Sequence, residues 1–144
     1  MTLFANEKHE TYIAPWEQTK WLVASSCFFL IPATYAHIHN LYLHSTVLFI
    51  TFIISVNYWI KAKHSWRRNF DLVYAKCSFI LFVSNGVFYV IPGYIGLFVL
   101  LYCFYISGKI LNQKKEYWYK YHALFHFLLA CEQFIIIDSI LNTL

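Results

Sequence analysis

Apolar residues dominate five long stretches of the chain, and short polar segments separate them. The stretches cover approximately residues 20–39, 41–60, 71–91, 93–111 and 118–142. Each is close to the roughly 20 residues that an α-helix needs to cross the hydrocarbon core of a bilayer. A helix is required there, because lipid offers no water to satisfy exposed backbone groups. The pattern predicts an all-α fold, a polytopic transmembrane bundle of about five helices over residues 20–144, preceded by an N-terminal segment, 1–19.

Local signals refine these elements. His39 and Asn40 are expected to break the chain between the first two helices. Pro32 is expected to kink the first helix without ending it. Asn69 is expected to cap the third helix, with Asp71 in its first turn, where the helix dipole favours an acid.

Composition supports a membrane location. Charged residues make up 12% of the chain and apolar residues 60%, whereas a water-soluble domain carries about a quarter charged residues. The formal charge of +4 comes from short basic clusters between the apolar stretches. Because such clusters are typical of membrane flanks, we expect membrane lipids as partners and no nucleic acid.

The basic residues also predict the orientation. With five crossings, ten of the 11 lysines and arginines lie in segments on the side that holds the N-terminus. They are Lys8, Lys20, Lys61, Lys63, Arg67, Arg68, Lys109, Lys114, Lys115 and Lys120. Lys76 lies just inside the third helix and can extend towards the same side. Since basic flanks stay in the cytoplasm, the N-terminus is predicted to be cytoplasmic.

Polar residues inside the predicted helices fall on defined faces. The third helix carries Asp71, Tyr74, Ser78 and Asn85 at spacings of 3, 4 and 7. The last helix carries His122, His126 and Gln133 at spacings of 4 and 7, and Ser55 lies near the end of the second. Such spacings place each set on one helix face, so the polar stripes are expected to meet inside the bundle.

Two histidines four residues apart on a helix can both bind a tetrahedral metal ion, so His122 and His126 are candidate ligands. The simpler interpretation is that they are interfacial residues that bond neighbouring helices. Ser55, His64 and Asp71 are predicted to lie near the same cytoplasmic face. Each also has a simpler interpretation: a serine bonding its own backbone, a solvated loop histidine, and an acid beside basic residues in a helix's first turn.

These residues resemble a known family. His122-Ala-Leu-Phe-His126 is similar to the last-helix His-x-x-x-His motif of the CREST superfamily of membrane hydrolases, which includes alkaline ceramidases, progestin and adiponectin receptors and haemolysin III-like proteins. Ser55 and Asp71 match, in order and approximate separation, a serine near the end of an early helix and an aspartate that opens the next. Trp66-Arg-Arg-Asn-Phe-Asp71 is similar to the basic segment that leads into that aspartate.

The resemblance implies a zinc ion bound by His122 and His126, with Asp71 as general base and Ser55 holding that aspartate or the attacking water. The sequence departs from the family pattern at Trp59, because the family has its third histidine ligand at this position. Either His64 or the Asp71 carboxylate would have to replace that ligand. The family is also typically seven-helical, whereas five helices are predicted here.

Three functional hypotheses remain open from the sequence. The first is a zinc-dependent hydrolase acting on a lipid amide or ester near the cytoplasmic face. The second, favoured by Trp59, is a non-catalytic polytopic protein: an assembly subunit, or a degenerate family member without metal. The third is a small channel or proton path that uses Asn85, Glu132 and Gln133. The substrate, the oligomeric state and the host membrane are not determined by the sequence.

Overall fold

The computed structural model describes residues 12–89, 94–113 and 116–144, with side chains at these positions except 86–89, 94–100 and 112. In these ranges all regular secondary structure is helical, which confirms the all-α prediction. The predicted break at Pro92 and Gly93 lies outside the described residues.

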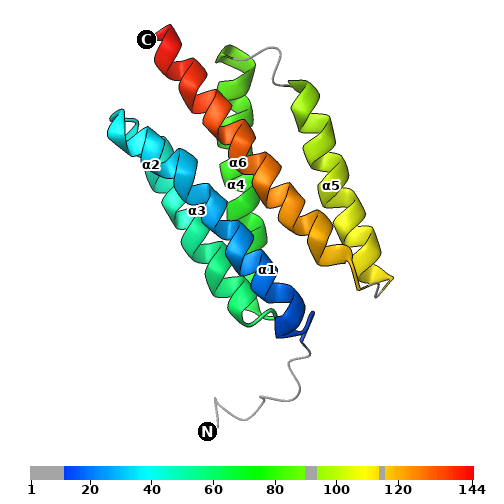
Figure 1. Ribbon diagram of the computed structural model, residues 1–144. Helices are drawn as coiled ribbons and strands as arrows, with labels where there is room; N and C mark the ends of the chain where they lie inside the picture. The colour runs from blue at the N-terminus through cyan, green and yellow to red at the C-terminus, as the bar shows by residue number, and fades with distance from the viewer. Residues whose placement is uncertain (1–11, 90–93, 114–115) are drawn as a thin grey trace, which may run out of the picture.

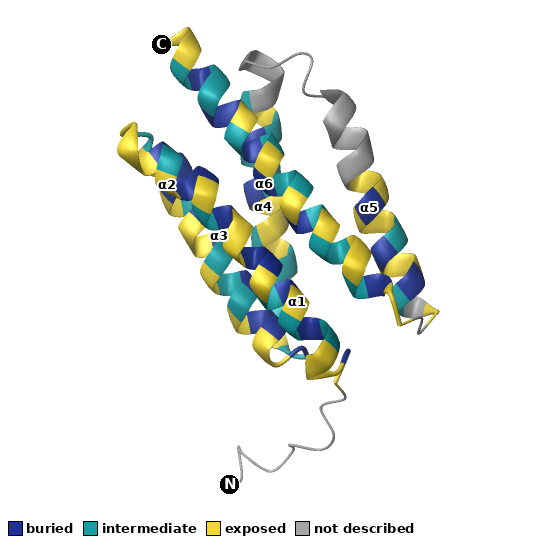
Figure 2. Cartoon of the chain, viewed as in Figure 1, coloured by how far each residue is buried: buried dark blue, intermediate teal, exposed yellow. Residues whose placement is uncertain are grey.

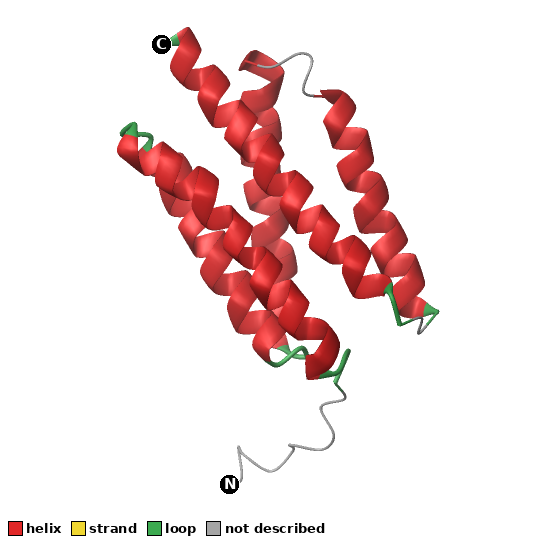
Figure 3. Ribbon diagram, viewed as in Figure 1, coloured by secondary structure: helices red, strands yellow, loops and turns green. Residues whose placement is uncertain are grey.

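Five long helices make up the described chain (Figure 1, Figure 3). The first consists of α1 (Trp16–Ser26), the 3-10 turn η1 (Cys27–Phe29) and α2 (Leu30–Ile38) in direct succession. It is followed by α3 (Tyr42–Ile60), α4 (Trp66–Tyr89), α5 (Tyr94–Asn112) and α6 (Trp118–Thr143). Three of them, Trp16–Ile38, Tyr42–Ile60 and Trp118–Thr143, are long and apolar enough to cross a membrane.

Two helices begin earlier than predicted, at Trp16 instead of 20 and at Trp66 instead of 71. The prediction followed the apolar residues, whereas the helices extend further into their polar flanks. Asn69 therefore lies inside α4 and does not cap it, and no acidic residue lies in the first turn of α4. The prediction for Asn69 and Asp71 was wrong on this point.

Pro32 interrupts the first helix without ending it, as predicted. Its nitrogen has no proton to donate to the carbonyl of Phe28, one turn earlier. The backbone tightens to the 3-10 turn Cys27–Phe29 just before the proline and then continues as α2 to Ile38.

The first connection ends α2 with a Schellman motif. Asn40 has a positive φ of 62°, its N–H donates to the carbonyl of His37, and the N–H of Leu41 donates to Ala36. Leu41 then packs on the apolar cluster that contains Ala36. Asparagine tolerates the left-handed conformation better than most residues, which explains the predicted break at this position.

The helices form a ring with one helix outside it. The first helix packs on α3 and α6, and α4 packs on α3 and α6, so that α1–α2, α3, α4 and α6 surround a common axis. The outer helix is α5, which packs on α6 (Figure 1). Because the connections are short, α3 runs opposite to α4 and α6.

The interior of this ring is unusually polar. Eleven polar residues among those described are buried: Thr19, Ser25, Ser26, His44, Ser45, Thr51, Ser55, Ser78, Ser107, His126 and Gln133. All but Ser107 belong to the ring helices. The predicted burial of the polar stripes is thus confirmed at Ser78, His126 and Gln133, whereas Asp71 and Asn85 are only half-buried.

Many large apolar residues, by contrast, are exposed. Figure 2 shows the exposed positions in yellow along the outward faces of the helices. Ile38, Leu43 and Ile80 each expose more than three fifths of their surface. Many exposed large apolar side chains, together with polar residues buried inside the bundle, suit a lipid environment. The described chain thus has the helices and the surface of a membrane protein.

Two apolar clusters close the ring above and below its polar middle. One contains Leu22, Tyr58, Trp59 and Trp118, near the start of α1. The other contains Ala33, Leu48, Phe82 and Ile137, towards the end of α6. Buried polar residues of α1, α3 and α6 lie between them, and they form the candidate site described next.

The Schellman motif makes a specific prediction. Asn40→Val should lower the free energy of unfolding by about 1–2 kcal/mol, because a β-branched side chain is strained at positive φ. Asn40→Gly, the matched control, should not lower it. Equilibrium unfolding in mixed detergent micelles measures both, and equal stability of the two variants would contradict the assignment.

Candidate functional site

The two candidate histidines of α6 lie together at the end of the bundle where α6 begins. The ring centroids of His122 and His126 are 4.9 Å apart, and the rings meet edge to face. His126 is buried at 4% exposure, whereas His122 is partly buried. The spacing of four residues therefore does bring both imidazoles to one face of α6.

Ser25 of α1 holds His126. Its Oγ lies 2.8 Å from Nδ1 of His126 and 3.0 Å from the carbonyl oxygen of Leu22. A hydroxyl has one proton, which the serine donates to the carbonyl. The serine oxygen then accepts a hydrogen bond from Nδ1–H of His126, and the Nε2 of this neutral imidazole carries the lone pair.

Ser107 of α5 holds His122 in the same way. Its Oγ lies 3.3 Å from Nδ1 of His122 and donates to the carbonyl oxygen of Phe104 at 2.8 Å. Because the single proton of the Ser107 hydroxyl is donated to Phe104, Nδ1 of His122 must carry the proton of the second hydrogen bond. In both histidines Nδ1 makes the hydrogen bond, which leaves Nε2, a nitrogen that can bind a metal, without a proton.

Ser55 joins this polar layer from α3. It is 4% exposed, and its Oγ lies 2.8 Å from Oγ of Ser26, which donates to the carbonyl oxygen of Leu22 at 2.8 Å. Ser55 therefore donates to Ser26. Its hydrogen-bond partner is thus a residue of the neighbouring helix α1. The role predicted from the resemblance, which is to hold Asp71 or a water molecule, stays a prediction.

Trp59 occupies the space beside the histidines. Its ring centroid lies 5.1 Å from that of His122 and 5.9 Å from that of Trp118. It is 5% exposed and belongs to the apolar cluster at this end of the ring. The residue at the expected third-ligand position therefore packs directly against a proposed ligand, and its indole cannot bind zinc.

Neither of the two residues expected to replace the third ligand lies with His122 and His126. His64 is exposed in the connection between α3 and α4, and Asp71 is half-buried in α4. Within the described residues, no group of three or more His, Cys, Asp or Glu side chains could hold a metal ion. A catalytic zinc site needs three protein ligands, and this donor set supplies two, so the residues as arranged do not fit the metal centre implied by the resemblance.

The polar residues of the channel hypothesis do not form a continuous network either. Asn85 Nδ2 donates to the carbonyl of Leu81, one turn earlier on the same helix, at 2.7 Å. Glu132 is half-buried, whereas Gln133 beside it is 1% exposed.

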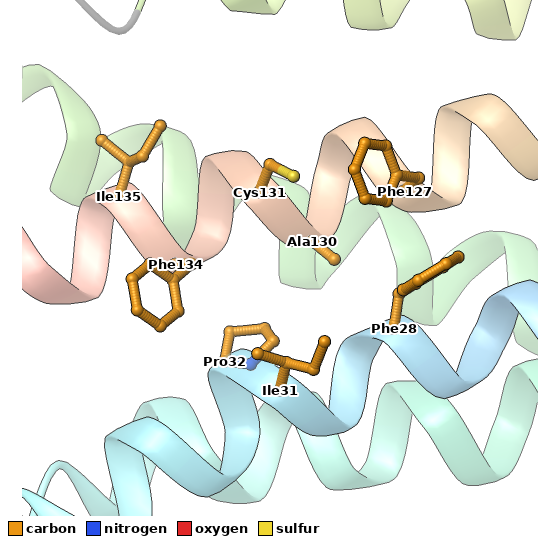
Figure 4. Close-up of a pocket in the computed structure, with 8 residues that line it drawn as sticks. All are labelled: Phe28, Ile31, Pro32, Phe127, Ala130, Cys131, Phe134 and Ile135. Atoms are coloured by element: carbon orange, nitrogen blue, oxygen red, sulfur yellow. The ribbon is translucent and has the colours of Figure 1, made fainter.

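An apolar groove lies on the outer surface between α2 and α6, with a volume of about 340 Å³ (Figure 4). Phe28, Ile31 and Pro32 line one side and Phe127, Ala130 and Phe134 the other. Ala130 is one turn from His126 along α6, so the groove passes close to the histidine pair.

Three serines of the site, Ser25, Ser26 and Ser107, were not predicted from the sequence. The adjacent serines 25 and 26 are a visible interruption of an apolar stretch. Serines in membrane helices often bond their own backbone, and these three do so. That they also reach the histidines and Ser55 depends on how distant helices pack, and no local pattern contains this information.

The Ser25 contact predicts a measurable loss of stability. Ser25→Ala should lower the free energy of unfolding by about 1–2 kcal/mol, because it leaves Nδ1–H of His126 unpaired inside the bundle. Ser84→Ala is the matched control, since Ser84 is exposed on α4 and bonds only the carbonyl of Ile80 on its own helix. Equal losses in the two variants, measured by unfolding in mixed micelles, would show that His126 gains nothing from Ser25.

Comparison with known proteins adds no family assignment. No family model matches the chain, and neither a curated protein nor a solved structure is significantly similar to it. The geometry of its own residues is therefore the basis for the proposals that follow.

Proposed function

We propose that this chain is a multi-pass membrane protein with five crossings and a cytoplasmic N-terminus. Supporting this, the start of α1, the α3–α4 connection and the α5–α6 connection lie at the same end of the bundle (Figure 1). Lys20, Arg67 and Lys120 belong to these three places, and the basic residues of the sequence cluster around them. The positive-inside rule assigns this end to the cytoplasm.

For the site itself, the proposal is a non-catalytic role: the chain is a degenerate relative of the CREST hydrolases that it resembles. The observation that carries this is the packing of Trp59 against His122, at the position where the family has its third ligand. A side chain of this size, buried between His122 and Trp118, fills the volume in which a third ligand would complete the metal centre.

In this account the histidine pair has a structural role. His126 connects α6 to α1 through Ser25, and His122 connects α6 to α5 through Ser107. Hydrogen bonds between helices in membranes are each worth roughly 0.5–2 kcal/mol. His126 thus joins two helices that are distant in sequence, and His122 joins two consecutive ones, as expected of a subunit that must keep its shape within a membrane assembly.

A second candidate function is the zinc-dependent lipid hydrolase. It is supported by the two unprotonated Nε2 atoms, which can bind a metal, and by the apolar groove beside Ala130, whose lining suits the acyl chain of a lipid substrate. This candidate requires His64 or Asp71 to move to the histidine pair as third ligand.

Metal content separates the two candidates. The wild-type protein, purified in detergent, should contain no stoichiometric zinc, whereas Trp59→His should bind about one zinc ion per chain through three histidines. Trp59→Phe is the control, because it removes the indole without adding a ligand. Elemental analysis measures the zinc in each sample, and the protein concentration of the same sample gives the number of zinc ions per chain.

Two results would contradict the proposal. Stoichiometric zinc in the wild type that disappears in a His122→Ala/His126→Ala double variant would favour the hydrolase. A folded Trp59→His protein without zinc would mean that residue 59 does not occupy a ligand position, and the likeness to the hydrolase family would lose its structural basis.

A further inference from the structure

Three buried polar atoms in the ring lack hydrogen-bond partners among the described residues: His44 Nε2, Ser78 Oγ and Gln133 Oε1. Their residues are 8%, 5% and 1% exposed, respectively. A buried acceptor or donor that is left unpaired costs free energy, and surrounding lipid cannot supply a partner. Each of these atoms therefore needs a partner inside the bundle.

The three residues lie on three helices of the ring, each four residues before a member of one apolar cluster. His44 precedes Leu48 by four residues on α3, Ser78 precedes Phe82 on α4, and Gln133 precedes Ile137 on α6. Leu48, Phe82 and Ile137 belong to a single buried cluster. Each of the three polar residues therefore lies about one helical turn, roughly 6 Å along its own helix, from this cluster.

The contact between His44 and Phe82 fixes the arrangement further. Their ring centroids are 5.5 Å apart, edge to face, so His44 lies level with Phe82. Because α4 and α6 run in the same direction, Ser78 and Gln133 are both displaced by one turn from the cluster towards the polar layer of Ser26 and Ser55. The three unpaired atoms thus come from α3, α4 and α6 around the axis of the ring.

Ser78 differs from other hydroxyl residues of this bundle. Thr51 and Ser84 each donate to the carbonyl four residues earlier on their own helices, at 2.8 and 2.6 Å. Ser78 makes no such bond, although this solution is open to it. Its hydroxyl proton is therefore still available to another partner.

We propose that His44, Ser78 and Gln133 form an internal water-binding site, in the half of the ring that contains the cluster of Leu48, Phe82 and Ile137. Water matches the unpaired atoms chemically, because it accepts a hydrogen bond from the Ser78 hydroxyl and donates to Gln133 Oε1 and His44 Nε2. Buried waters typically make about three hydrogen bonds of this kind to otherwise unsatisfied groups. The site is independent of metal binding at His122 and His126.

X-ray radiolytic labelling of the full chain in detergent tests this directly, since hydroxyl radicals form from bound water and oxidise the side chains beside it. Leu48 and Leu22 are the matched pair, because both are 0% exposed and only Leu48 borders the proposed site. In the wild type, Leu48 should be oxidised faster than Leu22. In Gln133→Leu, oxidation of Leu48 should fall to the level of Leu22.

Oxidation of Leu48 no faster than that of Leu22 in the wild type would overturn the proposal. Thermal unfolding gives a second readout. If water pairs the amide, Gln133→Leu removes these hydrogen bonds and its melting temperature falls, whereas a rise would indicate a dry, unpaired amide and would also contradict the site. Ser78→Ala should lower Leu48 oxidation in the same way and serves if Gln133→Leu does not fold.

Discussion

Lipid cannot hydrogen-bond, and this single constraint accounts for most of the structure. Every backbone group in an apolar segment must be paired within its helix, which makes the described chain helical. Every polar side chain in those helices must find its partner inside the bundle. Ser25 pairs with His126 from α6, and Ser55 with Ser26 from the first helix. The polar contacts that order the helices are thus concentrated along the axis of the ring, while isoleucines and leucines face outwards.

This constraint also relates the two ends of the ring to each other. At the end where α6 begins, the histidines are paired through their Nδ1 atoms and the remaining space is taken by Trp59. Towards the other end, polar groups are buried without partners in the chain. At the first end, an aromatic side chain packs against the polar cluster. At the other end, we propose that water supplies the missing hydrogen-bond partners. The proposed loss of a metal centre and the proposed internal water site both involve the same inward-facing polar stripes.

Much of the fold follows from local sequence. The number of helices, the break at Asn40 and the placing of His122 and His126 on one face depend on length, turn chemistry and periodicity, and the structure agrees with each. The start of α4 at Trp66 was missed, because apolar residues mark where lipid begins and not where the helix begins. The partners of the histidines were missed for another reason. Ser25 and His126 are 101 residues apart, and their contact depends on the order of helices around the ring.

The central claim is that the chain crosses the membrane five times with its basic end in the cytoplasm. The most direct test uses intact cells that carry the protein in their plasma membrane, labelled with a membrane-impermeant maleimide, in a variant whose four native cysteines are replaced by alanine. Single cysteines introduced at His39, after α2, and at Tyr94, where α5 begins, should react from outside, whereas one at Gln113, after α5, should react only once the membrane is opened. Labelling of Gln113→Cys in intact cells, or protection of both other positions, would contradict the five-crossing account.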